Sequence, residues 1–248
     1  MYMKKNTKIG SKITFLDSVD STNNYVAKLV NENKIDNGQV IMADFQGEGR
    51  GQRGAVWHSE RGMNILISIF LELDNLSVKN QTLISKYVAV SIYDALKSLG
   101  LLPKIKWPND LLINGKKICG ILIENQFTGH QIKSSIIGIG LNVNQVVFEI
   151  DKITSLTLEL GTKQDRMSIL GILINSFNKN LDYIEKNSDY IDEIYLRNLY
   201  LLEERSNFYN EKLGDFVGVI TGIDHDGKLL VSTEGRISSF DVKELKFC

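Results

Sequence analysis

Two arginines lie in an unusually glycine-rich segment, residues 46–54, which reads Gln-Gly-Glu-Gly-Arg-Gly-Gln-Arg-Gly. Four glycines in nine residues allow the backbone to turn tightly and to approach a ligand closely. Arg50 and Arg53 add permanent positive charge, which suits a phosphate or a carboxylate. The segment therefore predicts an anion-binding loop; the alternative is a flexible surface loop with solvated arginines.

Residues 49–54 also fit Gly-x-Gly-x-x-Gly, the pattern of dinucleotide-binding domains. That pattern has to begin a helix, whereas residues 55–62 predict another loop that leads into a strand. We therefore reject a dinucleotide-binding domain. Trp57, at the end of the loop, is expected in the core rather than over a ligand.

Lys117 is a second candidate for contact with an anion. It follows the segment 106–110, Lys-Trp-Pro-Asn-Asp, and the hairpin turn Asn114-Gly115. The strand that it begins is apolar on both faces, which predicts a central strand and a partly shielded lysine. Shielding from water makes the charge more effective against an anionic ligand. The alternative is a hairpin lysine in solvent, as we expect for Lys116.

Two further segments combine polar side chains with tight backbone. Glycines 138 and 140 interrupt an apolar strand, and such glycines weaken a strand unless something packs closely against them. Asn142 could then present its amide to a ligand, although a sheet crossing that needs small residues explains the glycines equally well. Residues 20–23, Asp-Ser-Thr-Asn, predict a helix cap whose hydroxyl and amide groups also suit a neutral polar ligand.

The elements that would position these residues follow from apolar periodicity. Strands are predicted at 12–16, 38–45, 64–71, 104–107, 111–113, 117–124 and 132–143, and helices after Ser21 and at 79–98, 167–184 and 188–202. Short strands follow at 216–220, 229–232 and 237–242. Strands in succession with single helices between them indicate an α+β fold. We expect one domain over residues 1–208 and a small β domain over 209–248.

Composition excludes several classes of protein. The 248 residues carry a formal net charge of -1, so no overall positive field would attract nucleic acid. No apolar run approaches the ~18 residues of a membrane span, and residues 1–10 show no signal peptide, so we expect a cytoplasmic protein. Two cysteines make no disulfide framework, and three separated histidines lack the spacing of zinc ligands, so we expect no zinc site.

Taken together, the motifs resemble the catalytic domain of biotin protein ligases. The resemblance rests on Gly-Arg-Gly-x-x-Gly, on Lys-Trp-Pro-Asn-Asp followed by Asn-Gly-Lys-Lys-x-x-Gly, and on Gly-x-Gly-x-Asn, in the order and spacing of that family. It implies a class II aminoacyl-tRNA-synthetase-like domain, with a mixed sheet and flanking helices, and a C-terminal SH3-like β-barrel. It also implies a short form without the N-terminal winged helix of many bacterial members, because the first strand begins near Lys12.

The resemblance further implies an ATP- and Mg²⁺-dependent ligase. Such an enzyme converts biotin to biotinyl-5'-AMP and transfers it to a lysine of a biotin carboxyl carrier domain, with Lys117 and Arg50 as the catalytic residues. The positions implied for biotin are Ser21, Thr22, Asn23, Gln46, Gly49, Arg50, Gly51, Lys117, Gly120, Gly138 and Gly140. Those implied for the nucleotide and its phosphates are Arg50, Gln52, Arg53, Asn109, Asp110, Lys117 and Asn142. Mg²⁺ would be held mainly by the phosphates of ATP.

Two positions depart from the family pattern. Gln52 and Ala55 stand where members often carry arginine, which leaves open how tightly the reactive adenylate is retained. The expected partners are biotin, ATP and the carrier domain, without nucleic acid or membrane, for a monomer or homodimer. A lipoate protein ligase and a non-catalytic sensor of biotin or its adenylate are the alternatives.

Overall fold

A mixed seven-stranded sheet is the centre of the computed structural model, which describes residues 2, 4, 7–186 and 188–248. In spatial order its strands are β1 (Ile13–Leu16), β2 (Val40–Ala43), β3 (Ile65–Ser77), β7 (Gln131–Leu141), β6 (Lys116–Thr128), β5 (Asp110–Ile113) and β4 (Pro103–Lys106). Strands β1 and β2 are parallel, and every other pair is antiparallel. The sheet matches the predicted strands, with shifts of a few residues at their ends.

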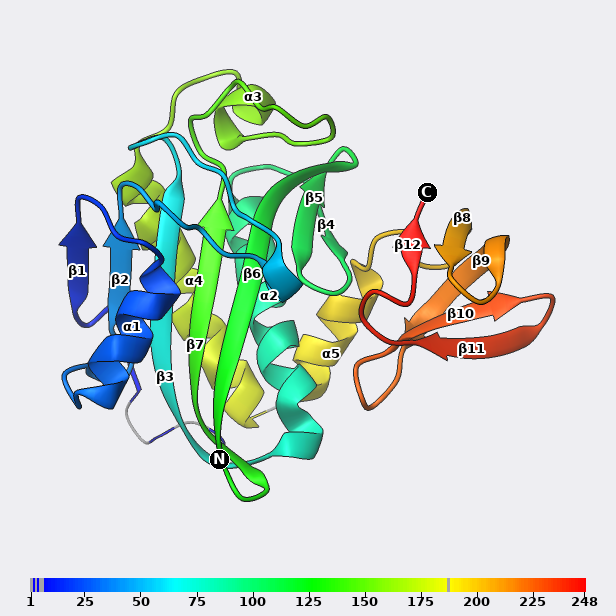
Figure 1. The fold of residues 1–248 in the computed structure, drawn as a ribbon, viewed down its shortest axis with the longest axis horizontal. Helices are drawn as coiled ribbons and strands as arrows, with labels where there is room; N and C mark the ends of the chain where they lie inside the picture. The colour runs from blue at the N-terminus through cyan, green and yellow to red at the C-terminus, as the bar shows by residue number, and fades with distance from the viewer. Residues whose placement is uncertain (1, 3, 5–6, 187) are drawn as a thin grey trace.

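Helices cover both faces of this sheet (Figure 1). The α-helices are α1 (Thr22–Asn31), α2 (Gln81–Ser98), α3 (Leu156–Leu160), α4 (Arg166–Lys186) and α5 (Ser188–Arg197). Helix α1 packs on one face, where Val26 meets Ile41, Phe70 and Ile136. Helices α2, α4 and α5 pack on the other face and close the main core. The order of strands and helices is that of an α+β fold.

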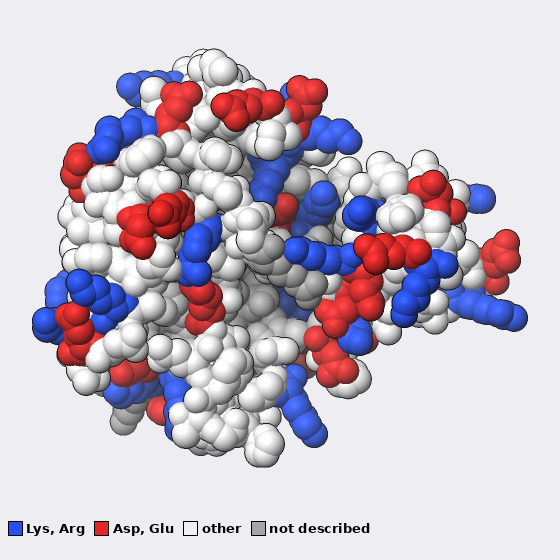
Figure 2. Space-filling view, viewed as in Figure 1, with Lys and Arg blue, Asp and Glu red and all other residues white. Residues whose placement is uncertain are grey.

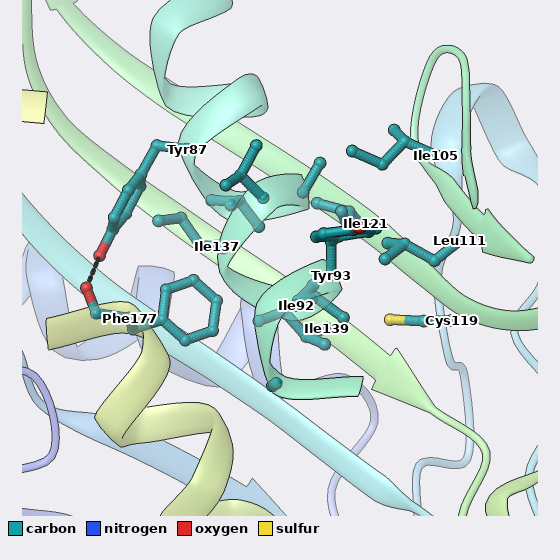
Figure 3. Close-up of a cluster of buried hydrophobic side chains, with 14 of the residues drawn as sticks. Tyr87, Ile92, Tyr93, Ile105, Leu111, Cys119, Ile121, Ile137, Ile139 and Phe177 are labelled. Carbon is teal, nitrogen blue, oxygen red and sulfur yellow. Dashed lines mark hydrogen bonds between the residues drawn. The ribbon is translucent and has the colours of Figure 1, made fainter. Parts of the chain in front are cut away.

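The main core lies between the sheet and helices α2 and α4 (Figure 3). The apolar stripe predicted on α2 is fully buried, and α2 begins at Gln81 after a 3-10 turn over Val78–Asn80. Tyr87 on α2 meets Phe177 on α4 edge to face, with ring centroids 5.7 Å apart. The Tyr87 hydroxyl donates a hydrogen bond to the Phe177 carbonyl at 2.9 Å. Burial raises the pKa of Tyr87, so the hydroxyl keeps its proton.

Replacing Tyr87 with phenylalanine tests this buried hydrogen bond. We expect the free energy of unfolding to fall by about 1 kcal/mol, because the bond is lost while the ring contact remains. Urea denaturation followed by circular dichroism measures the change. Tyr25→Phe, on α1 outside this core, is the control. Equal stability of Tyr87→Phe and the unmodified chain would show that the bond contributes nothing.

A second, antiparallel sheet follows α5. In spatial order it contains β11 (Arg236–Phe240), β10 (Leu229–Thr233), β9 (Gly214–Ile223), β8 (Arg205–Asn210) and β12 (Lys246–Phe247). Strands β8 and β12 were not predicted, and β8 spans the predicted domain boundary at 208. Helix α5 ends at Arg197 rather than at residue 202. Leu199 and Leu202 instead form bridges to Ile105 and Ile220, one in each sheet, so this connection is tied to both sheets.

Candidate active site

A cavity of about 670 Å³ lies between the large sheet, the glycine-rich loop and the C-terminal module, defined here as residues 205–248. In the space-filling view the surface is hollowed between the two parts, and basic side chains stand at the edge of the hollow (Figure 2). The predicted site residues that line it are Ser21, Thr22, Asn23, Gln46, Arg50, Gly51, Gln52, Asn109, Asp110, Lys117, Gly120, Gly138 and Gly140. Segments far apart in the sequence therefore converge on one cavity.

Lys117 is held at this cavity by its backbone and its side chain. Its N–H donates to the Lys152 carbonyl at 2.7 Å, and its carbonyl accepts from the Thr154 N–H at 2.9 Å. Its Nζ lies 2.7 Å from Asp110 Oδ1, and its side chain is 32% exposed. The predicted shielding is therefore present, whereas Lys116 is exposed as expected. Such a partly screened, fixed ammonium group suits a bound carboxylate or phosphate.

Asn142 is the predicted nucleotide contact that the structure places elsewhere. Among the described residues, its side chain is not part of the cavity lining. It is 2% exposed, and its amide donates to the Thr154 carbonyl at 3.1 Å. Because Thr154 pairs with the backbone of Lys117, the placement favours a supporting role for Asn142 behind that lysine.

Paired glycines form the floor of the cavity. Gly120 and Gly140 are register partners on β6 and β7, and the indole of Trp57 lies across both. A Cβ would stand 2.8 Å from this ring at Gly120 and 2.4 Å from it at Gly140, so only glycine permits the contact. The expectation of a core role for Trp57 is therefore wrong: the ring is half-buried and lines the cavity. Its Nε1 is buried with no hydrogen-bond partner among the described residues.

Polar side chains at the start of α1 form one end of the cavity. Ser21 is the N-cap residue by position, but its side chain makes no capping hydrogen bond although it is only 2% exposed. Thr22 donates from its N–H to Gln46 Oε1 at 2.8 Å and from its hydroxyl at 3.0 Å. The helix cap predicted for residues 20–23 thus does not account for these side chains. Ser21, Thr22 and Asn23 all line the cavity, and the binding of a neutral polar ligand there stays a prediction.

The glycine-rich loop lines the cavity with Arg50, Gly51 and Gln52, whereas Gly49, which was predicted for biotin, lines a neighbouring outer cavity. Gly49 lies against the backbone of Trp57, where a Cβ would stand 2.4 Å from the carbonyl oxygen. Gly51 donates to the Ala55 carbonyl at 2.7 Å, so the loop folds back on itself. Residues Gln52–Gly54 form a single 3-10 turn, and the next element is the strand β3. No α-helix begins at the glycines, so the segment is not a dinucleotide-binding motif, as predicted. The side chain of Arg53 lies outside the part of the chain that is described.

The C-terminal module supplies the far wall, which the motifs did not indicate. The residues that it contributes are Glu211, Val242, Lys243, Leu245, Lys246 and Phe247. Lys106 faces this wall, with its Nζ 5.0 Å from the centroid of Phe247. Burial lowers the pKa of Lys106, and the nearby charge of Lys117 lowers it further, while Asp110 opposes both. Lys106 belongs to the motif at 106–110, but the resemblance implies no role for it.

Comparison with known proteins now adds to this geometry. Residues 15–142 match the model of the biotin/lipoate A/B protein ligase family, and that span covers more than half of the chain. The chain belongs to this family. It is 34% identical over 241 residues to the bifunctional ligase/repressor BirA of Bacillus spizizenii. The matched region covers 94% of this chain and 73% of that protein. It is 27% identical to the biotin–[acetyl-CoA-carboxylase] ligase of Mycobacterium tuberculosis, over 84% of this chain and 80% of that protein.

Solved structures of biotin ligases share the fold of this family member. Biotin protein ligase from Aquifex aeolicus, in complex with biotin and ATP, superposes with a TM-score of 0.77 at 27% identity, covering 96% of this chain and all of that one. The biotin acetyl coenzyme A carboxylase synthetase of Helicobacter pylori, at 23% identity and a TM-score of 0.62, shares the fold. The coverage includes the second antiparallel sheet, so the likeness extends beyond residues 15–142.

Carboxylates for a metal ion are few in the described cavity. Asp110 and Glu211 line it, and no group of three or more His, Cys, Asp or Glu residues placed to hold a metal occurs in the described chain. Mg²⁺ commonly binds through substrate phosphates and one or two carboxylates, and it retains several waters. The residues present fit such a shared ion and do not form a cage of protein ligands.

None of the described helices is long and apolar enough to cross a membrane.

Proposed function

We infer that this chain is a biotin protein ligase that forms biotinyl-5'-AMP from biotin and ATP and transfers biotin to a lysine of a biotin carboxyl carrier domain. The observation that carries this function is the convergence of Lys117, the loop cation Arg50 and the polar end around Thr22 on one cavity. Relatives that match most of the chain are named as biotin ligases, including one solved with biotin and ATP.

In the first step a carboxylate oxygen of biotin attacks the α-phosphorus of ATP. The P–O bond to the β-phosphate breaks, and pyrophosphate leaves. The two reactants are anions that repel each other, so the protein has to align them and offset the charge at phosphorus. We assign this charge to Lys117, which is fixed by Asp110 and the backbone of residues 152–154, and to Arg50 in the loop. Mg²⁺, when bound, would neutralise pyrophosphate.

In the second step the neutral amine of the carrier lysine attacks the carbonyl carbon of the mixed anhydride. The bond to AMP breaks, an amide forms, and the amine loses a proton. Neither step uses a nucleophile of the enzyme. Cys119 agrees with this, because it is fully buried and burial raises the pKa of its thiol far above the usual range.

The same proposal extends to the two domains and to the setting of the protein. The large sheet with its helices, residues 1–208, would be the class II synthetase-like domain, and residues 209–248 an SH3-like barrel that closes over the nucleotide. The second sheet supports that closure by lining the cavity. We propose Mg²⁺ as the metal, a cytoplasmic setting, and a monomer or homodimer that does not bind nucleic acid.

The test of function is incubation with ATP, Mg²⁺ and either biotin or lipoate, followed by measurement of pyrophosphate and of the mass of an added carrier domain. We expect biotin-dependent pyrophosphate release and one biotin on the carrier lysine. Release with lipoate alone would assign the chain to lipoate ligation within the same family. Binding of biotin without pyrophosphate release would identify a sensor.

Gln52 allows a separate prediction about adenylate retention. It lines the cavity where family members often carry arginine. Gln52→Arg should slow the release of biotinyl-5'-AMP about tenfold, because a hydrogen bond to a charged group contributes about 1.5 kcal/mol. A chase of labelled adenylate with excess biotin measures the rate. Gln131→Arg, at the far end of β7, should leave it unchanged. Equal release rates for Gln52→Arg and the unmodified chain would remove retention from the role of this position.

A further inference from the structure

A chain of polar contacts connects the Thr22 end of the cavity with the loop arginine, and Ser68 is its central member. Ser68 is fully buried in the apolar strand β3, where nothing in the proposed reaction calls for a hydroxyl group. Its Oγ lies 2.8 Å from Thr22 Oγ1 and 2.5 Å from Asn23 Oδ1. A hydroxyl has one proton, so Ser68 donates either to Thr22 or to Asn23, and it can keep both contacts as hydrogen bonds only when the Thr22 hydroxyl donates to Ser68. The Thr22 hydroxyl can instead donate to Gln46. The direction of the Thr22 hydroxyl proton therefore decides how Ser68 and Asn23 are hydrogen-bonded.

Asn23 connects Ser68 on β3 with Glu124 on β6. Its Nδ2 donates to Glu124 Oε2 at 2.7 Å and, more weakly, to the Leu122 carbonyl at 3.3 Å. Gly138 is the register partner of both Ser68 and Leu122, and a Cβ there would stand 2.6 Å from Asn23 Oδ1. The missing side chain on β7 therefore leaves the space in which the amide reaches from β3 to β6.

Glu124 is the last member, and it holds Arg50. Both carboxylate oxygens accept from the same guanidinium nitrogen, Nη2, at 2.8 and 2.9 Å. A guanidinium has five N–H donors, so an arginine held through one nitrogen keeps donors for a phosphate. Arg50 lines both the main cavity and an outer cavity of about 530 Å³, whereas Glu124 lines only the outer one among the described residues. The pair thus stands in the wall between the two cavities.

We propose that Glu124 is a positioning residue, which holds Arg50 at the cavity wall and does so in response to what binds at Thr22 and Gln46, through Asn23 and Ser68. The inference rests on the proposed function for its ligand, biotin, and not for its geometry. When the polar ring of biotin accepts a hydrogen bond from the Thr22 hydroxyl or donates one to Gln46 Oε1, the hydrogen bonds of Ser68 and Asn23 rearrange. The hydrogen bonds between Arg50 and Glu124 then change before negative charge develops at phosphorus.

The hold itself is tested without any ligand, by hydrogen exchange of the loop amides. Gly51 and Trp57 donate within the loop, so exchange of their amides reports its opening. We expect Glu124→Gln to raise the exchange rates of these amides about fivefold. In a chain that already carries Arg50→Ala, adding Glu124→Gln should raise them no further. Glu48→Gln, an exposed carboxylate on the same outer cavity, is the matched control. Unchanged exchange in Glu124→Gln, or an equal rise in the Arg50→Ala background, would overturn the hold.

The coupling is tested by adding biotin alone. We expect biotin to change exchange in the loop of the unmodified chain, and Ser68→Ala to lose most of that change while biotin still binds by calorimetry. Ser91→Ala, a buried serine on α2 that donates to the Tyr87 carbonyl, is the control for loss of a buried hydroxyl. A full loop response in Ser68→Ala, or no response in the unmodified chain, would overturn the coupling.

An activity measurement separates this inference from the function on which it rests. With ATP present, Glu124→Gln should release biotinyl-5'-AMP about tenfold faster than the unmodified chain, with little change in the KM for ATP. Absence of pyrophosphate release from the unmodified chain would reject the ligase function, while the exchange results would still decide the hold. Normal release with unchanged retention in Glu124→Gln would reject the positioning role alone.

Discussion

Replacing Lys117 with alanine should reduce biotin-dependent pyrophosphate release by about 10²–10³-fold at saturating substrates. Removal of one preorganised charged donor typically costs about 3–4 kcal/mol in the transition state. Lys117 fits that role because its Nζ is fixed 2.7 Å from Asp110 and its backbone is bracketed by residues 152–154. The side chain is 32% exposed and its ion pair with Asp110 lies at the cavity, so the variant should remain folded.

Lys116→Ala is the matched control for this prediction. It removes an equal charge from the adjacent, exposed position at the start of β6. We expect its rate to stay within about twofold of the unmodified chain, because exposed charges contribute little. Thermal unfolding of both variants checks that they fold. A Lys117→Ala chain with near-normal rates at saturating biotin and ATP would contradict the central assignment.

Phe177→Ala should lower the free energy of unfolding by about 3–5 kcal/mol, the usual cost of removing a buried aromatic ring. Phe177 is fully buried between α4 and α2, against the ring of Tyr87 (Figure 3). The α2–α4 layer supports the sheet whose β6 and β7 carry the cavity floor. We therefore expect substrates to bind normally at low temperature and activity to be lost at lower temperature than in the unmodified chain.

Denaturation in urea measures this loss, and Met167→Ala provides the comparison. Met167 lies on the same helix but is 46% exposed, so its substitution should change stability by at most about 0.5 kcal/mol. If Phe177→Ala is too unstable to purify, Phe177→Leu should show a smaller loss in the same direction. Equal stability of Phe177→Ala and Met167→Ala would contradict the described core.

Local patterns in the sequence predicted most of the elements. The apolar stripe of α2, the Asn114-Gly115 hairpin and the strand from Lys117 all occur as expected, because periodicity and turn chemistry act over a few residues. The elements that were not predicted are strands β8 and β12 and the five-residue helix α3. Strand β12 has two residues and is formed by pairing with β8, about 40 residues earlier, which no local pattern encodes. The end of α5 is likewise decided by bridges of Leu199 and Leu202 to other strands.

Most of the residues that were predicted for the site do line the cavity, although they make up less than half of its lining. The motifs did not distinguish Asn142, which lies behind Lys117, from residues that face the cavity, because both types occur in the same short segment. Ser68 carried one signal that could have been used, a polar residue within the apolar run Ile-Ser-Ile at 67–69. The sequence favours a core position for Trp57, whereas two facing glycines give its ring a place in the cavity.

By itself the sequence determined that the chain has an α+β fold and that Lys117 lies partly shielded at the start of a central strand, and it predicted an anion-binding, glycine-rich loop. These follow from residue types and spacings within single segments. The tertiary structure alone decided that Arg50 meets Glu124, 74 residues later, and which residues of the C-terminal module line the cavity. Such contacts depend on strand order and register, through which β3, β7 and β6 bring Ser68, Gly138 and Leu122 side by side.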